Sequence, residues 1–327
     1  MNQALPRVGI VVVNWRGLPQ TRHCVRSLQA AAAAYPSARI YVVDNGSGDG
    51  SEAVIASEFP EVAVVAVAEN RGYSAGCNAG IQRAIAEGAD YLWILNNDTE
   101  ADAAAAGTLV QAAEELRTDG SEAILAPKIL DGRSGTIWSA GGFLRQPWFK
   151  GDHVGLGEPA EAHDEPAEAE WASSCSLFFH RDVIERVGPL PEEYFMYLDD
   201  IDWCLRARKA GVLVRYEPGA VIAHGVSEAM RSLDNRHVRY YSYRNYYLLA
   251  FRHSGLPGRA WFAAHLLTAL AKGAVRWALF PSYRRSEHYN VRTRAIVDFL
   301  RGRRGRSPYS DRAQALPSSP AQTAVEA

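Results

Sequence analysis

Three carboxylates stand within four positions of the chain, in the run Asp199-Asp200-Ile201-Asp202. Aromatic and aliphatic side chains flank this run on both sides, so we expect the carboxylates to be at least partly buried. Like charges this close repel, and burial raises their free energy further unless a metal ion, a cationic partner or a proton-transfer role compensates. The alternative is a helix start, where Asp caps exposed N–H groups. Residues elsewhere in the chain must decide between these readings.

Polar side chains also follow three apolar segments that are predicted to be strands. Asn14 ends the first, Asp44 ends the second, and Asn96-Asn97-Asp98 ends the fourth. In open α/β sheets, ligands bind beyond the carboxyl ends of the strands. Asp44 could accept a hydrogen bond from a nucleobase N–H or a ribose hydroxyl. The alternative is a turn-forming Asp before Asn-Gly.

Two of these positions have the chemistry of a metal site. Asp98 is well placed for a hard divalent cation, because carboxylates and diphosphate oxygens are the usual ligands of Mg²⁺ and Mn²⁺. His224 follows another predicted strand and could add an imidazole ligand. The alternatives are a helix-capping Asp98 and a His224 that is satisfied within the core. The expected cofactor is Mg²⁺ or Mn²⁺.

The elements that must position these residues alternate between strand and helix. This alternation is typical of an α/β domain with a largely parallel sheet. Residues 155–170, rich in Glu, Ala and Pro, are expected to form a mobile loop. The expected strands are 8–14, 39–44, 62–66, 91–95, 124–130, 171–180 and 213–216, and the expected helices are 19–34, 51–57, 109–117 and 182–187. Two further helices are expected: residues 69–80 open one that runs to about 87, and another follows the acidic run and ends at about 210.

Several classes of protein are excluded. The chain has no Walker-type Gly-Lys-Ser/Thr and no Gly-x-Gly-x-x-Gly after its first strand, which argues against a P-loop or a dinucleotide-binding protein. Its four cysteines are far apart and form no Cys-x-x-Cys pair, which argues against a zinc site or a disulfide framework. No charged-then-apolar leader precedes Arg7, and the apolar stretch 260–280 is interrupted by His265, Lys272 and Arg276. We therefore expect a cytoplasmic protein without a membrane span.

Taken together, six segments resemble the family 2 glycosyltransferases with the GT-A fold, in particular bacterial rhamnosyltransferases of cell-surface polysaccharide synthesis. The resemblance covers about residues 7–255, and the ordered combination is more specific than any one segment. The matching segments are VVVNW at 11–15, VVDNGS at 42–47, ENRGYSAGCN at 69–78, LNNDT at 95–99, FMYLDDIDWCLR at 195–206 and AHG at 223–225.

The resemblance implies a role for each matching residue. Asp200 would be the general base of an inverting transfer, with Asp199 as the fallback and Asp202 structural. Asp98 and His224 would hold the metal; Asn96 replaces the first Asp of the family's Asp-x-Asp position, which leaves Asp98 as the charged ligand of that motif. The residues expected to bind the nucleotide-sugar are Asn14, Asp44, Asn70, Gly72, Asn78, Asn97 and Asp98.

The resemblance also implies a hexose donor, such as dTDP-rhamnose, and a glycan or polyprenyl-linked acceptor. Two alternatives stay open: the same fold with UDP-galactofuranose or UDP-N-acetylglucosamine as donor, and a non-catalytic protein that binds a sugar nucleotide as a scaffold.

The C-terminal part differs in charge from the rest. Residues 231–312 hold 17 Lys/Arg against 4 Asp/Glu, a charge of +13, although the whole chain carries −2. Basic and aromatic residues on helices suit the surface of an anionic membrane, at the inner face of the plasma membrane. A dimerising helical pair is the alternative, and no motif supports nucleic-acid binding. The expected organisation is a catalytic domain over 1–230, a basic helical extension over 231–304 and a disordered tail over 305–327.

Overall fold

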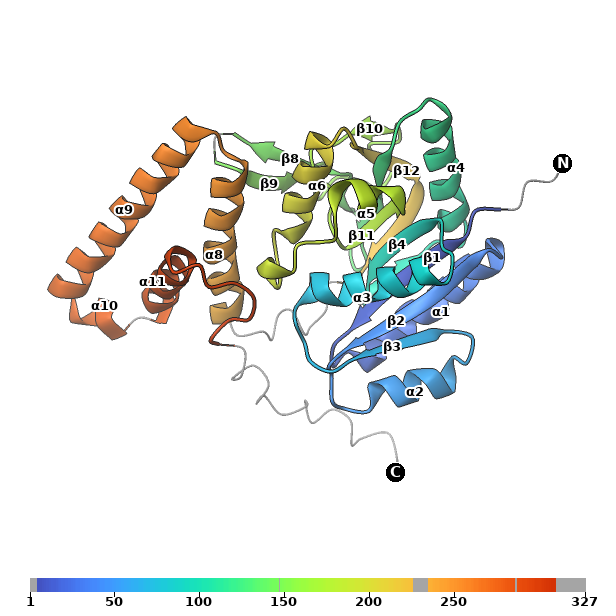
Figure 1. The fold of residues 1–327 in the computed structure, drawn as a ribbon, viewed down its shortest axis with the longest axis horizontal. Helices are drawn as coiled ribbons and strands as arrows, with labels where there is room; N and C mark the ends of the chain where they lie inside the picture. The colour runs from blue at the N-terminus through green and yellow to red at the C-terminus, as the bar shows by residue number, and fades with distance from the viewer. Residues whose placement is uncertain (1–4, 147, 226–234, 286, 310–327) are drawn as a thin grey trace.

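The computed structural model describes residues 5–146, 148–225, 235–285 and 287–309. Its centre is a mixed, mostly parallel sheet that contains ten strands within this part of the chain, in the order β10-β12-β6-β11-β4-β1-β2-β3, with β5 beside β12 and β7 beside β6 (Figure 1). The ten strands are β1 Val8–Asn14, β2 Ala38–Asn45, β3 Ala63–Val67, β4 Tyr91–Asn96, β5 Thr99–Ala101, β6 Ala123–Asp131, β7 Ile137–Ser139, β10 Ala167–Glu168, β11 Ser176–His180 and β12 Leu213–His224. The hairpin of β8 Gly142–Arg145 and β9 Lys150–His153 forms a separate two-stranded sheet.

Helices cover both faces of the sheet. The central strand β1 is buried along its whole length, and its side chains alternate between two apolar clusters, with Val11 and Val13 in one and Ile10 and Val12 in the other. The first cluster includes residues of α3, α5 and α6, and the second includes residues of α1, α2 and α4. These helices are α1 Leu18–Ala34, α2 Ser51–Glu58, α3 Tyr73–Ala86, α4 Ala105–Thr118, α5 Asp182–Val187 and α6 Asp199–Lys209, with a short 3₁₀ helix at Glu192–Tyr194.

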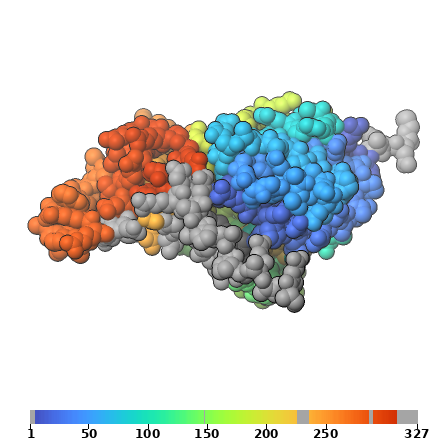
Figure 2. All heavy atoms as spheres, turned by 90° about the horizontal axis from the view of Figure 1, so that it is seen from below, coloured from blue at the N-terminus to red at the C-terminus, as the bar shows by residue number. Residues whose placement is uncertain are grey.

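The C-terminal helices form a separate arm beside the sheet domain. They are α8 Asn235–His253, α9 Leu256–Leu279, α10 Pro281–Arg285 and α11 Glu287–Leu300. Helix α8 lies against the sheet domain through Leu248 and Leu249, and α11 packs on α8 through Val291 and Ala295. Helices α9 and α10 project outward, away from the sheet domain (Figures 1 and 2). Among the described residues, no helix is both long enough and apolar enough to span a bilayer.

The fold class and the principal strands are as predicted, and the differences lie in short segments. The expected mobile loop 155–170 is instead anchored, because β10 pairs with β12 and buried Lys128 donates to Ala160 O and Ala162 O. The expected strand 171–180 begins at Ser176, and the expected strand 213–216 continues through a bulge to His224.

The first residues of the expected disordered tail are instead held against the rest of the protein. Gly305 N donates to Glu193 O, and Ser307 is buried. Residues 310–327 lie outside the described part of the chain.

Candidate active site

The acidic run begins helix α6, so its role as a helix start is confirmed: all three carboxylates lie in the first turn. The backbone before it is strained. Phe195, Tyr197 and Leu198 have φ of +67°, +65° and +65°, a region that non-glycine residues rarely adopt. Such strain persists when the surroundings enforce it and is common at functional sites. The run is therefore more than a helix start.

Helix α8 supplies the groups that hold this strained loop. The side-chain amide of Asn245 donates to the carbonyls of Tyr194, Met196 and Tyr197 at 3.0, 2.7 and 3.0 Å. The guanidinium of Arg244, which is fully buried, donates to Tyr194 O at 2.7 Å. The C-terminal arm therefore contributes directly to the position of the acidic run.

The first two carboxylates have different surroundings. Asp199 is 2 % exposed and accepts a hydrogen bond from Ser74 Oγ at 2.7 Å. Asp200 is half-buried, and its two oxygens accept from Ser174 N at 3.2 Å and Ile201 N at 2.9 Å. Burial, together with the charge of Asp199, raises the pKa of Asp200 to about 7. Asp200 is therefore the more accessible carboxylate, and its pKa suits a general base at neutral pH.

This pKa predicts the pH dependence of activity. A general base works in its deprotonated form, so kcat/KM should rise with pH through about 7 and reach a plateau above it. The measurement is a pH–rate profile of the wild type and of Asp200→Asn. Loss of the acidic limb in the variant would assign that limb to Asp200. An identical limb in both proteins would assign it to another group.

Asp98 and His224 are brought together as expected. Asp98 lies in the turn between β4 and β5, so it caps no helix, and its backbone carbonyl accepts from Gly225 N at 2.8 Å. His224 ends β12, which pairs with β5, and this pairing places His224 Nε2 3.4 Å from Asp98 Oδ1. One carboxylate oxygen and one imidazole nitrogen thus face each other, and both could bind the same cation.

The buried Cys175 thiol lies between this pair and the acidic run. Asp98, Asp200 and His224 all contribute to the electrostatic potential at Cys175, whose pKa is raised by burial. Burial opposes protonation of His224, but the charges of Cys175 and Asp98 outweigh it and raise the pKa of His224 to about 10. A histidine must be neutral to ligate a metal, so metal binding here would displace a proton.

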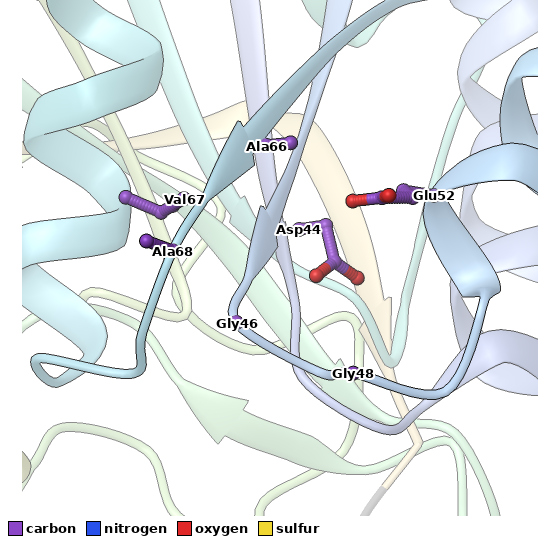
Figure 3. A pocket seen from close by; sticks show the side chains of 7 residues that line it. All are labelled: Asp44, Gly46, Gly48, Glu52, Ala66, Val67 and Ala68. Carbon is purple, nitrogen blue, oxygen red and sulfur yellow. The ribbon is translucent and has the colours of Figure 1, made fainter.

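A cavity of about 440 Å³ opens at the ends of β2 and β3. Figure 3 shows the carboxylates of Asp44 and Glu52 directed into the same space. Asp44 also holds the adjacent loop by accepting from Ser47 N at 2.9 Å and Ser51 Oγ at 2.8 Å. Burial would raise the pKa of Asp44, but these hydrogen bonds outweigh it and lower the pKa. Asp44 therefore forms the turn and also lines the cavity, and its contact with a nucleotide stays a prediction.

Two other residues expected at the nucleotide are fully engaged inside the protein. Asn14 is 0 % exposed, donates to Asp44 Oδ2 at 2.9 Å and accepts from Thr21 Oγ1 at 2.9 Å. Asn78 is buried and exchanges two hydrogen bonds of 3.0 Å with the backbone of Leu190. We correct their assignment: Asn14 positions Asp44, and Asn78 positions the segment that leads to the acidic run.

The remaining predicted residues shape the backbone around the cavity. Asn70 Oδ1 accepts from Gly72 N at 2.8 Å, and Asn97 Nδ2 donates to Thr21 Oγ1 at 3.0 Å. Gly72 has a φ of +106°, and a Cβ there would lie 2.5 Å from Phe195 O, so a side chain is excluded. This close approach joins the start of α3 to the acidic run, and Tyr73 N donates to Phe195 O at 2.8 Å.

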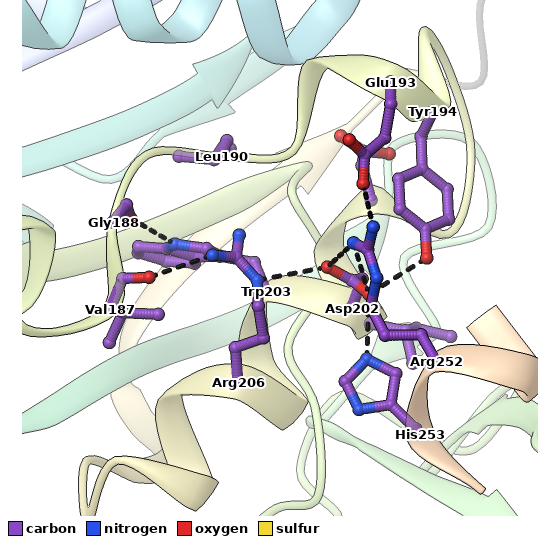
Figure 4. A network of polar contacts seen from close by, with 12 residues as sticks. Val187, Gly188, Leu190, Glu193, Tyr194, Asp202, Trp203, Arg206, Arg252 and His253 are labelled. Carbon is purple, nitrogen blue, oxygen red and sulfur yellow. Dashed lines mark hydrogen bonds and ion pairs between the residues drawn. The ribbon is translucent and has the colours of Figure 1, made fainter. Parts of the chain in front are cut away.

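Asp202 has the structural role that the sequence predicted. It is 0 % exposed and lies at the centre of the network in Figure 4. His253 Nε2 lies 2.8 Å from its Oδ1, and Arg252 Nη1 and Arg206 Nε each lie 3.1 Å from its Oδ2. Burial would raise the pKa of Asp202, but the His253 hydrogen bond and the Arg252 charge lower it. Asp202 therefore ties α6 to the end of α8.

An aromatic wall beside His224 was not predicted from the sequence. The ring centroid of Trp138 lies 4.8 Å from that of His224 and 4.4 Å from that of His153. Ser74 and Ser174, which bond Asp199 and Asp200, were missed as well. The small polar run 173–176, set between apolar residues, was the available signal for Ser174. Trp138 has no such signal, because its partners lie 15 and 86 positions away.

Elsewhere among the described residues, Glu122, His180 and Asp182 form a group with metal-type ligands. This group lies at the opposite end of the strands from Asp98. His180 pairs with Tyr91 at the start of β4, whereas Asp98 follows the end of β4. Arg117 forms ion pairs with both Glu122 and Asp182. These charges are therefore already compensated, and the group is separate from the Asp98–His224 pair.

Comparison with known structures shows that the chain has the GT-A fold of glycosyltransferases. The chain superposes on a mannosyltransferase of Pyrobaculum calidifontis, solved with GDP-Man and Mn²⁺, with a TM-score of 0.52 at 19% identity, over 90% of this chain and 87% of the other. It also superposes on GalNAc-T7, solved with UDP, GalNAc and Mn²⁺, with a TM-score of 0.55 at 15% identity, over 97% and 59% of the two chains.

Sequence comparison agrees with the fold. Residues 9–133 match the model of glycosyl transferase family 2. The chain is 27% identical to an N-acetylglucosaminyl-diphospho-decaprenol L-rhamnosyltransferase of Mycobacterium tuberculosis, over 90% of this chain and 94% of the relative. The resemblance seen in the sequence motifs is thereby confirmed.

Proposed function

We propose that the protein transfers a hexose, L-rhamnose from dTDP-rhamnose, with inversion, to a lipid-linked glycan. The observation that carries this proposal is the half-buried Asp200, which accepts from Ser174 N and Ile201 N and whose pKa is about 7, together with the facing Asp98–His224 pair. The named activity of the mycobacterial relative supports the sugar and the lipid-linked acceptor. The cavity at Asp44 is of a size that suits a nucleotide.

In this proposal the acceptor hydroxyl lies against Asp200. The carboxylate takes the hydroxyl proton as the acceptor oxygen bonds to the anomeric carbon, and the bond from that carbon to the diphosphate breaks, leaving the electron pair on the nucleoside diphosphate. Asp199 is already bonded to Ser74 and buried. Its negative charge instead keeps the pKa of Asp200 high, so that Asp200 binds the proton well.

The residues at Asp98 fit a divalent cation. A carboxylate and an imidazole face each other, and His224 Nδ1 is buried without a hydrogen-bond partner, so His224 has no competing contact on that side. Mn²⁺ accepts both nitrogen and oxygen ligands, and Mg²⁺ prefers oxygen, so this pair favours Mn²⁺. When bound, the cation would stabilise the charge on the departing diphosphate.

Replacing Asp98 tests this assignment. Asp98→Ala removes the charged ligand, so donor affinity in the presence of Mn²⁺ should fall by roughly 10- to 100-fold. The measurement is donor binding by calorimetry with Mn²⁺ and with EDTA. Glu100→Ala is the matched control, because Glu100 lies two positions away and its exposed side chain pairs with His23. Unchanged affinity of Asp98→Ala in excess Mn²⁺ would remove Asp98 from the site.

The donor can be identified by a thermal-shift screen. A ligand at 100 times its Kd adds about 2.7 kcal/mol to the free energy of unfolding. dTDP-rhamnose should raise Tm most among dTDP- and UDP-sugars tested with Mg²⁺ or Mn²⁺. A larger shift with UDP-galactofuranose or UDP-N-acetylglucosamine would change the donor. A shift without any turnover of donor would favour the scaffold alternative.

We further propose that the enzyme works in the cytoplasm, peripherally at the inner face of the plasma membrane. The support is the basic arm, whose helix α9 exposes Val275, Trp277 and Leu279 beside Lys272 and Arg276. Exposed apolar and basic side chains on one helix suit an anionic bilayer surface. Sedimentation with anionic liposomes should weaken when the region after Arg259 is removed. Equal sedimentation would leave the homodimer as the better account of the arm.

A further inference from the structure

A second cavity, of about 320 Å³, lies between the tip of the β8–β9 hairpin and the turn that joins α8 to α9. Its walls are largely apolar, and its volume falls at the small end of the roughly 300–1,000 Å³ typical of ligand sites. Phe262 is fully buried behind it, and the Phe149 and Phe262 rings lie 6.1 Å apart. The lining residues are Gln146, Phe149, His253, Ser254, Gly255, Gly258, Trp261 and Phe262.

The cavity contains a polar group without a partner. Ser254 is 93% buried, since its exposed fraction is 7%, and its hydroxyl makes no hydrogen bond. A buried hydroxyl without a partner is unfavourable, because it has lost its hydrogen bonds to water. Gly258 packs closely on this side chain, because a Cβ there would lie 2.8 Å from Ser254 Cβ and 3.1 Å from Ser254 Oγ. The largely apolar lining, with this one unpaired hydroxyl, suits a ligand that is mainly apolar.

The rim of the cavity is apolar and basic. Trp148 and Leu256 are 50% and 81% exposed, and the Trp148 ring contacts Trp261 with centroids 4.7 Å apart. The cationic side chains of Arg145 and Lys150 face each other across the hairpin, and Asp152 pairs with both. Arg259, exposed on α9, adds a third cation. Three cations against one carboxylate favour an anionic head group next to an apolar chain.

The walls of the cavity also contact the catalytic helix. His253 binds Asp202 at 2.8 Å, two positions beyond Asp200. Gly151 follows the lining residue Phe149 by two positions, and a Cβ at Gly151 would lie 2.5 Å from Ile201 Cδ1. The walls of the cavity therefore contact the first turn of α6, which holds the acidic run.

From this arrangement we propose that the cavity binds the hydrocarbon chain of the lipid-linked acceptor, with the diphosphate of that lipid at the basic rim. The inference rests on the proposed function, which supplies a lipid-linked acceptor. It adds a lipid-binding site in which Trp261, Phe262 and Phe149 contact the chain. A second copy of this protein would instead need a broad complementary surface, whereas a narrow cavity beside an exposed cationic rim suits a single chain with a charged head.

Farnesyl diphosphate, a short prenyl chain with a diphosphate, is the probe, and inorganic diphosphate is the head-group control. Binding is measured by calorimetry on the full chain. Gln146→Trp fills the rim from an exposed position, and Trp261→Ala removes a wall. Both should raise the Kd of farnesyl diphosphate at least tenfold. Leu267→Trp, which adds an indole at an exposed position of α9 outside the cavity, should leave it unchanged.

The inference would be overturned if the Kd of farnesyl diphosphate were unchanged in both cavity variants, or if inorganic diphosphate bound as tightly as farnesyl diphosphate. It would also be overturned if both variants weakened binding to neutral phosphatidylcholine vesicles to the same extent, which would assign the cavity to bulk lipid. Donor turnover is measured on the same samples. Leu267→Trp should keep wild-type release of nucleoside diphosphate in the absence of acceptor lipid. Failure of that turnover in the wild type would refute the proposed function without affecting the binding result.

Discussion

Asp200→Asn should lower kcat by roughly 10²–10⁴-fold while leaving the Kd of the donor unchanged, because general-base catalysis contributes this much to a rate. The amide keeps the shape of the side chain, and its oxygen can still accept from Ser174 N or Ile201 N. What it removes is the capacity to take a proton. The measurement is steady-state transfer, with donor binding determined separately.

Asp199→Asn is the matched comparison for this variant. Asp199 is 2 % exposed and bonded to Ser74, so it should not reach an acceptor hydroxyl. Its loss should lower the pKa of Asp200, whose elevation depends in part on the charge of Asp199. We therefore expect a modest fall in kcat and an acidic limb shifted to lower pH. A severe loss in Asp199→Asn, with near-normal activity in Asp200→Asn, would exchange their roles.

Asp202→Ala should lower the free energy of unfolding by about 3–5 kcal/mol, the range expected when one partner of a buried ion pair is removed. The variant would leave Arg252 and His253 buried against an empty position, and it would detach the end of α8 from α6 (Figure 4). Urea denaturation monitors the change. Glu58→Ala, which breaks the surface pair with Arg22, is the control and should change stability by about 1 kcal/mol or less.

The same carboxylate predicts a pH dependence of stability. The pKa of Asp202 is lowered in the folded state, so its contribution is fully present above the unfolded-state pKa and is lost as the pH falls through the lowered folded-state value. The wild type should therefore lose more stability on acidification than Asp202→Ala does. Parallel stability curves for the two proteins would show that Asp202 is not the group responsible.

The sheet could be predicted where the sequence is strongly patterned. The apolar runs that became β1, β2 and β4 were clear, because strands buried on both faces consist of continuous apolar residues. The short strands β5, β7, β8 and β9 were missed. Each has three or four residues, too few for a period to be recognised, and their pairing depends on partners distant in the sequence.

For the site, residue types could be predicted but partners could not. Asp98 and His224 were expected to meet, and the pairing of β5 with β12 places them 3.4 Å apart. Asn14 and Asn78 were expected at the ligand and are instead fully bonded within the protein. An amide in a motif has the same appearance in either role, because its hydrogen-bond partners, such as Leu190 for Asn78, lie far along the chain.

The support of the acidic run by α8 was also beyond sequence analysis. Arg244 and Asn245 belong to a segment rich in basic and aromatic residues. Such a composition suggests side chains exposed on a surface, not side chains that support a loop. The structure instead shows both side chains buried against the carbonyls of the strained loop. Positive φ at Phe195, Tyr197 and Leu198 has no signature in these residue types, so the need for such support was not visible.

The most direct test of the central claim is the anomeric configuration of the product, determined by NMR on material formed from the donor that gives the largest thermal shift. A single displacement assisted by Asp200 predicts a configuration opposite to that of the donor, with formation of the product abolished or strongly reduced in Asp200→Asn. Retention of configuration, or no transfer by the wild type with any nucleotide-sugar tested in Mn²⁺, would contradict the account.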